Sequence, residues 1–215
     1  MTLQAPSYIA RTAVAGAPVR HSWTEQDASD ALLAQPQLTA RLAPLTLRAN
    51  LALSLGAAEW LAWRFSAELP DDEALQIIEA MWASMLDWSR FNFADLPDWI
   101  GQQPEEVGGP LDLGFGLLYE VFGNARERQP VADLTAQLLE LPVRVLPDPE
   151  AYKAWRREVI RRFEGAYVFG DGDPVGPPIA REALDPAQPF SPAAAESQLE
   201  AIAPEVNRFL GPPEA

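Results

Sequence analysis

The stretch from Pro44 to Ser89 constrains the fold most, because apolar side chains recur along it with only scattered charges between them. Pro44 suits the first turn of a helix, and from Leu47 to Phe65 the apolar side chains fall at steps of three or four residues, which predicts a helix with a wide buried face. Leu69-Pro70 interrupts this pattern, and the two aspartates that follow can cap a second helix. Helices joined by so short a turn usually pack antiparallel, so we expect a central antiparallel helix hairpin.

The rest of the chain is expected to surround that hairpin in one globular domain spanning residues 1–215. A chain of 215 residues can bury a core without disulfides, and it contains no cysteine to form them. We expect a mainly α fold with long loops rich in proline and glycine and at most one or two short strands. The expected divisions are an irregular N-terminal segment over 1–37, a helical core over 38–165 and a proline-rich segment over 166–215 with a terminal docking helix.

Charge is distributed unevenly along the chain. The net charge is −15, and residues 66–120 alone hold twelve acids and one base. Such a field repels nucleic-acid phosphates and anionic lipids and attracts basic proteins. We therefore expect a basic protein partner, and neither nucleic acid nor membrane; solubility alone is the alternative explanation for the acidic surface.

The sequence offers little for catalysis. His21 is the single histidine and lies in an expected loop, so it is a weak candidate for the base of a catalytic His–Ser pair. A catalytic His–Cys pair is excluded because the chain has no cysteine. The common motifs for phosphate, dinucleotide, zinc and calcium binding are missing, so we nominate no catalytic residue, metal site or cofactor. Glu59 is the exception. A carboxylate inside an apolar helix either pairs with a buried base, with Arg48 on nearly the same face, or faces a cavity with a raised pKa.

The connection after the hairpin is the predicted binding site. It mixes aromatic residues with acids, which suits a loop that binds a basic protein surface, and Gly108-Gly109-Pro110 is expected to break the chain there. A loop held over the core by its aromatic rings is the structural alternative. The predicted partner-binding residues, with the tryptophan as apolar anchor, are Asp95, Asp98, Trp99, Glu105 and Glu106.

A second charged feature has the opposite sign. Five of the sixteen basic residues lie between Lys153 and Arg162, on one side of an amphipathic helix. Such a patch can bind phosphate or RNA, but we favour a solvated face or neutralisation of the acidic region 66–120.

These features together predict a non-catalytic protein that binds a basic partner. One concrete form is a bacterial immunity protein or antitoxin that blocks the cationic active site of a toxin. Fifteen arginines to one lysine fit a GC-rich bacterial genome, and the lack of cysteine and of a secretory signal favours the cytoplasm. The alternatives are a carboxylate-dependent enzyme with a site near Glu59, and a structural subunit of a homo-oligomer.

Overall fold

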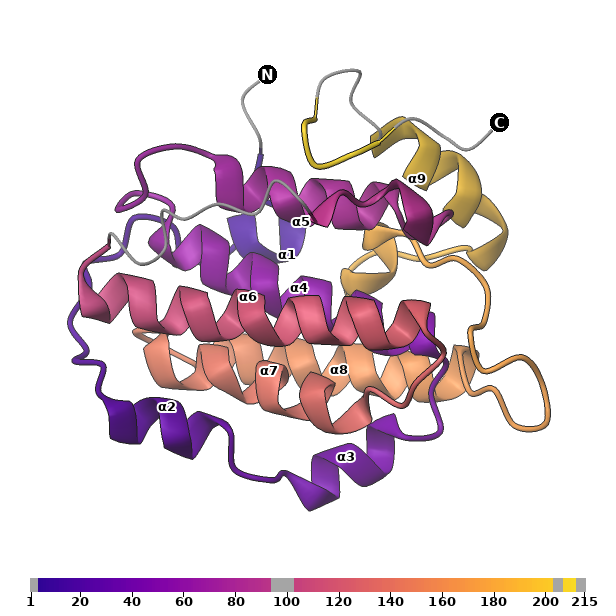
Figure 1. Cartoon of the computed structure of the whole chain (residues 1–215), viewed down its shortest axis with the longest axis horizontal. Helices are drawn as coiled ribbons and strands as arrows, with labels where there is room; N and C mark the ends of the chain where they lie inside the picture. The colour runs from indigo at the N-terminus through magenta and orange to yellow at the C-terminus, as the bar shows by residue number, and fades with distance from the viewer. Residues whose placement is uncertain (1–3, 94–102, 203–206, 212–215) are drawn as a thin grey trace.

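The structure is a computed structural model that describes residues 4–93, 103–202 and 207–211. The part of the chain that it describes is mainly helical and forms a single globular domain around α4 (Leu47–Phe65). Nearly every residue of α4 is buried, because four other helices pack around it (Figure 1). These are α5 (Glu73–Ala83), α6 (Glu105–Arg126), α7 (Ala132–Val145) and α8 (Glu150–Ala166).

Local sequence signals explain where α4 begins and how closely it packs. The Thr46 side chain accepts a hydrogen bond from the Ala49 N–H, which satisfies one of the free donors at the start of α4. Gly56 lies where α8 approaches, and a Cβ there would be 2.9 Å from the Trp155 ring. The absence of a side chain at Gly56 therefore permits this contact between α4 and α8.

Shorter elements cover the ends and one side of this core. α9 contacts α5, while α2 and α3 lie along α7 (Figure 1). The first 37 residues, expected to be irregular, contain two of these helices and the start of a third. The short helices are α1 (Ser7–Ala10), α2 (Glu25–Ala31), α3 (Pro36–Leu42) and α9 (Ala195–Ile202), and the 3₁₀ turns are Trp88–Arg90, Arg181–Leu184 and Pro192–Ala194.

Consecutive helices α4 and α5 contact one another at the expected positions, and their antiparallel arrangement stays a prediction. Within the described residues there is no β-strand; two isolated bridges join Leu45 to Val168 and Phe91 to Leu210. In those same ranges, no helix is both long enough and apolar enough to cross a membrane.

The predicted chain break at Gly108-Gly109-Pro110 is wrong, because these residues lie inside α6. Proline has no N–H, so Pro110 leaves the carbonyl of Glu106 without its helical partner. The His21 ring nitrogen Nε2 lies 2.8 Å from that carbonyl oxygen and supplies a donor instead. The Trp23 ring occupies the space where a Cβ of Gly109 would stand, 2.2 Å from its nearest atom. Contacts from the N-terminal segment thus support a helix that local rules disfavour.

Candidate functional site

The predicted binding residues fall on or just before the start of α6. Asp95, Asp98 and Trp99 lie outside the described residues, so their placement stays a prediction. Glu105 and Glu106 form the exposed first turn of α6, where the positive end of the helix dipole favours carboxylates. The structure therefore places these two acids on a rigid helix and not in the loop that the sequence predicted.

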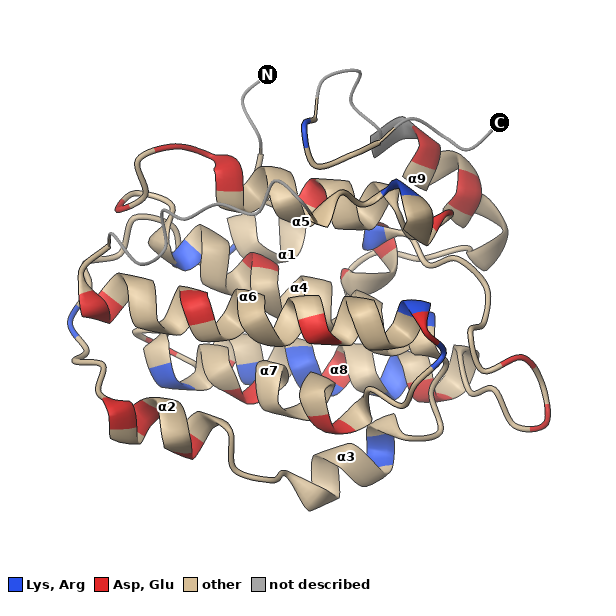
Figure 2. Ribbon diagram, viewed as in Figure 1, with Lys and Arg blue, Asp and Glu red and all other residues tan. Residues whose placement is uncertain are grey.

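The same side of α6 carries further acids along its length (Figure 2). Asp112, Glu120 and Glu127 are exposed like Glu105, and their spacing of seven or eight residues keeps them on one side of the helix. None of the described ion pairs or side-chain hydrogen bonds involves the carboxylate of any of these acids. We call Glu105, Glu106, Asp112, Glu120 and Glu127 the α6 acidic face.

Two glycines separate these acids on the surface. A Cβ built at Gly116 or Gly123 would meet no atom within 4 Å, so the backbone of α6 is open to solvent there. Sequence reasoning missed Asp112 and Glu120 as site residues because the expected break at Gly108-Gly109-Pro110 separated them from Glu105 and Glu106. A helical register extended back to Glu105 would have placed them on the same side.

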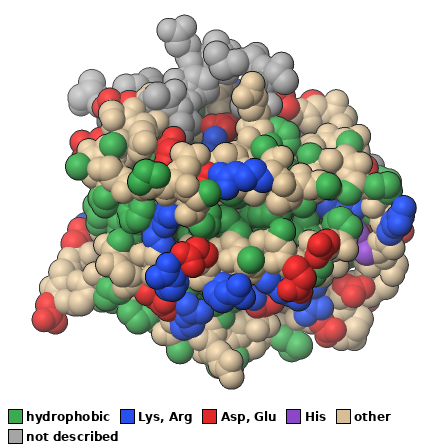
Figure 3. Space-filling view, turned by 180° about the vertical axis from the view of Figure 1, so that it is seen from behind, with side chains coloured by type: hydrophobic (Ala, Val, Ile, Leu, Met, Phe, Trp, Pro, Cys, Tyr) green, Lys and Arg blue, Asp and Glu red, His purple; other side chains and the backbone are tan. Residues whose placement is uncertain are grey.

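Some acids elsewhere in the described chain are neutralised by the protein's own arginines. Within the acidic stretch, Glu73 pairs with Arg208, and Glu79 accepts from Arg181 at 2.7 Å. On the opposite side of the molecule, basic and acidic side chains lie next to one another (Figure 3). The α6 acidic face is therefore distinguished by the number of unpaired carboxylates that lie on one side of a single helix.

The basic residues of α8 are largely engaged within the protein. Lys153 bonds Glu150 at 2.8 Å, Arg156 bonds Glu140 at 2.6 Å, and Arg161 bonds Glu158 at 2.5 Å. Arg162 instead donates to four backbone carbonyls between residues 183 and 188. These three acids all lie outside residues 66–120, so the described ion pairs of α8 do not provide the neutralisation of that stretch that the sequence led us to expect.

Glu59, the other candidate, is 1% exposed and lies in a buried polar cluster. Its Oε1 is 2.7 Å from Arg181 Nε and accepts from Trp82 Nε1 at 2.8 Å, while the Tyr8 hydroxyl donates to Oε2. Burial raises the pKa of Glu59, and Arg181 opposes that rise. The carboxylate thus pairs with a buried base, as one interpretation expected.

The base is Arg181 from the C-terminal segment, which no sequence pattern indicated. Arg48, the base expected on the same face, donates to the carbonyls of Gly176 and Leu86 instead. A pocket of about 210 Å³ next to the cluster is lined by Tyr8, Arg181 and Asp185, and Glu59 is not among its lining residues.

No group of three or more metal-ligating side chains occurs in the described ranges. His21, already engaged by the Glu106 carbonyl, has its pKa lowered chiefly by burial. Comparison with known proteins gives no family: no family model, no curated protein and no solved structure matches this chain.

Proposed function

We propose that this protein is a non-catalytic binding protein that captures a basic protein partner through the α6 acidic face. The observation that carries the proposal is the row of exposed carboxylates on α6 without an ion pair to any described base. The negative electrostatic potential of unpaired surface carboxylates is not cancelled by a neighbouring base, and this potential raises the rate of encounter with a cationic surface.

The shape of this face also suits a close contact. The bare backbone at Gly116 and Gly123 lets a partner's main chain or a long arginine approach α6. Asp95, Asp98 and the anchor Trp99 lie outside the described residues and remain predicted members of the binding site. A bacterial toxin with a cationic active site fits this chemistry, and the protein would then act as its immunity protein or antitoxin by occluding that site.

The two alternatives have less support. The oxygens of Glu59 are already occupied by Tyr8, Trp82 and Arg181, which favours a structural role over carboxylate catalysis. The oligomer alternative needs a hydrophobic hairpin that is free to pack on another subunit, whereas nearly every residue of α4 is already buried inside the described domain.

The test begins with capture of the partner from the native cell lysate by the tagged full-length protein, followed by association kinetics. A variant in which Glu105, Glu106, Asp112 and Glu120 become glutamine should associate about tenfold more slowly at low salt, with a weaker salt dependence. A matched control neutralises four exposed acids on α9 and the C-terminal loops: Asp171, Glu182, Glu196 and Glu200. Equal association rates for the wild type and the α6 variant, or equal slowing in the control, would refute the proposed face.

A further inference from the structure

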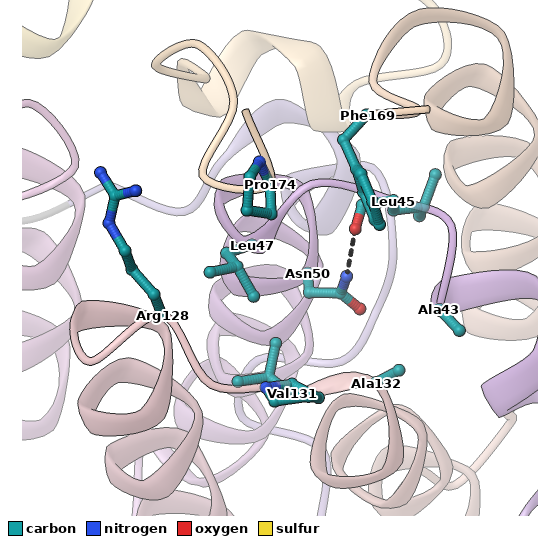
Figure 4. A pocket seen from close by; sticks show the side chains of 10 residues that line it. Ala43, Leu45, Leu47, Asn50, Arg128, Val131, Ala132, Phe169 and Pro174 are labelled. Atoms are coloured by element: carbon teal, nitrogen blue, oxygen red, sulfur yellow. Dashed lines mark hydrogen bonds between the residues drawn. The ribbon is translucent and has the colours of Figure 1, made fainter. Parts of the chain in front are cut away.

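An apolar pocket of about 180 Å³ lies where the start of α4 meets the segments on either side of it in space (Figure 4). Leu45 and Leu47 line it from the start of α4, Val131 and Ala132 from the start of α7, and Phe169 and Pro174 from the loop after α8. Only two of its lining residues, Asn50 and Arg128, carry polar side chains. The pocket is therefore suited to an apolar molecule with few polar groups.

The amide of Asn50 has a fixed orientation. Its Nδ2 donates to the carbonyls of Leu42, Leu45 and Thr46 at 3.2, 3.3 and 3.2 Å. The opposite assignment would direct the amide oxygen at three carbonyl oxygens, so the nitrogen must lie on that side. The oxygen Oδ1 consequently faces away from all three carbonyls.

This oxygen is a buried hydrogen-bond acceptor without a donor among the described residues. The Asn50 side chain belongs to a residue that is only 2% exposed. Figure 4 shows Oδ1 on the side of Asn50 that faces the space above Val131 and Ala132. A buried acceptor left without a donor is destabilising, and such groups in native proteins nearly always have one.

We propose that the pocket binds a small, mainly apolar ligand that donates one N–H or O–H hydrogen bond to Asn50 Oδ1, as a phenol or an indole can. The size is suitable, because a cavity of about 150 Å³ admits benzene. An ordered water needs two to four polar partners, and Asn50 Oδ1 is the one buried side-chain polar atom without a partner among the described residues that line this pocket, so water satisfies the site poorly. Arg128, at the pocket's edge, has a side chain 67% exposed and a long 3.8 Å contact with Asp173. This inference does not depend on the proposed partner.

The test compares phenol with toluene, which has the same ring and nearly the same size but no donor. Both are titrated into the uniformly ¹⁵N-labelled full-length protein. Transfer from water alone favours toluene by about tenfold, because the hydroxyl must be desolvated. Phenol is nevertheless expected to bind at least as tightly as toluene, and it should shift the side-chain amide resonances of Asn50.

The variant Ala132→Phe fills the pocket from the start of α7 and should abolish binding of both ligands. Ala154→Phe, which adds the same ring at an exposed site on α8, should leave binding unchanged. Tighter binding of toluene, no binding of either ligand, or binding that persists in Ala132→Phe would overturn the proposal. The ligand comparison and the Asn50 resonances use the wild-type protein, so the test stands even where Ala132→Phe does not fold.

Discussion

Removing Arg181 tests whether the buried cluster on α4 depends on its one cation. The substitution Arg181→Met keeps most of the aliphatic volume but leaves Glu59, 1% exposed, next to Glu79 without a positive charge between them. Breaking a buried ion pair by removing one partner costs about 3–5 kcal/mol. Tyr8 and Trp82 still donate to Glu59, so we expect a loss near the lower end, about 3 kcal/mol.

The expected loss depends on pH in a direction that the structure determines. Burial already raises the pKa of Glu59, and loss of Arg181 removes the charge that opposes this rise. A carboxyl whose folded pKa lies above its unfolded pKa loses its stabilising contribution as the pH rises through the folded pKa. The variant should therefore be most destabilised at neutral and higher pH, and the difference from the wild type should shrink as acid protonates Glu59.

Urea denaturation followed by tryptophan fluorescence, at pH 5 and at pH 8, measures this difference. The matched control is Arg161→Met, which breaks the pair with Glu158 at a side chain 70% exposed and should leave the free energy of unfolding nearly unchanged. The double variant Glu59→Gln/Arg181→Met should recover part of the loss, because no buried charge is left unpaired. An effect of Arg181→Met as small as that of the control, or one equal at both pH values, would show that the cluster is not an energetically important ion pair.

Further predictions concern α6 and its N-terminal support. Gly109→Ala should lower the free energy of unfolding by about 1–3 kcal/mol, because its Cβ would overlap the buried Trp23 ring. Gly116→Ala, seven residues along the same helix and open to solvent, should raise it by about 0.5–1 kcal/mol; equal effects in urea denaturation would contradict this packing. Burial lowers the pKa of His21, so the unfolded chain takes up the proton first and stability should fall as the pH drops below about 6.5. Replacement of His21 by alanine should remove that pH dependence, and should also lower stability at pH 8 by about 1 kcal/mol because the Glu106 carbonyl loses its donor.

The sequence alone determined the helical character of this protein and the sign of its charge. Apolar side chains repeat every three or four residues through α4, α5 and α8. This period specifies a helix with a buried face, whatever the position of that helix in the fold. The excess of acids was likewise readable from composition, since no arrangement of sixteen bases can neutralise thirty-one acids.

Only the tertiary structure decided which of these acids are unpaired, because pairing depends on neighbours distant in sequence. Glu59 is neutralised by Arg181, while the exposed acids of α6 form no ion pair with a described base. The helix through Pro110 likewise depends on distant residues. His21 supplies a donor to the Glu106 carbonyl, and the Trp23 ring packs against Gly109. Asn50 Oδ1 is left as a buried acceptor without a donor among the described residues, because three backbone carbonyls accept from the amide nitrogen of Asn50 and bring that residue into a pocket lined by three separate segments.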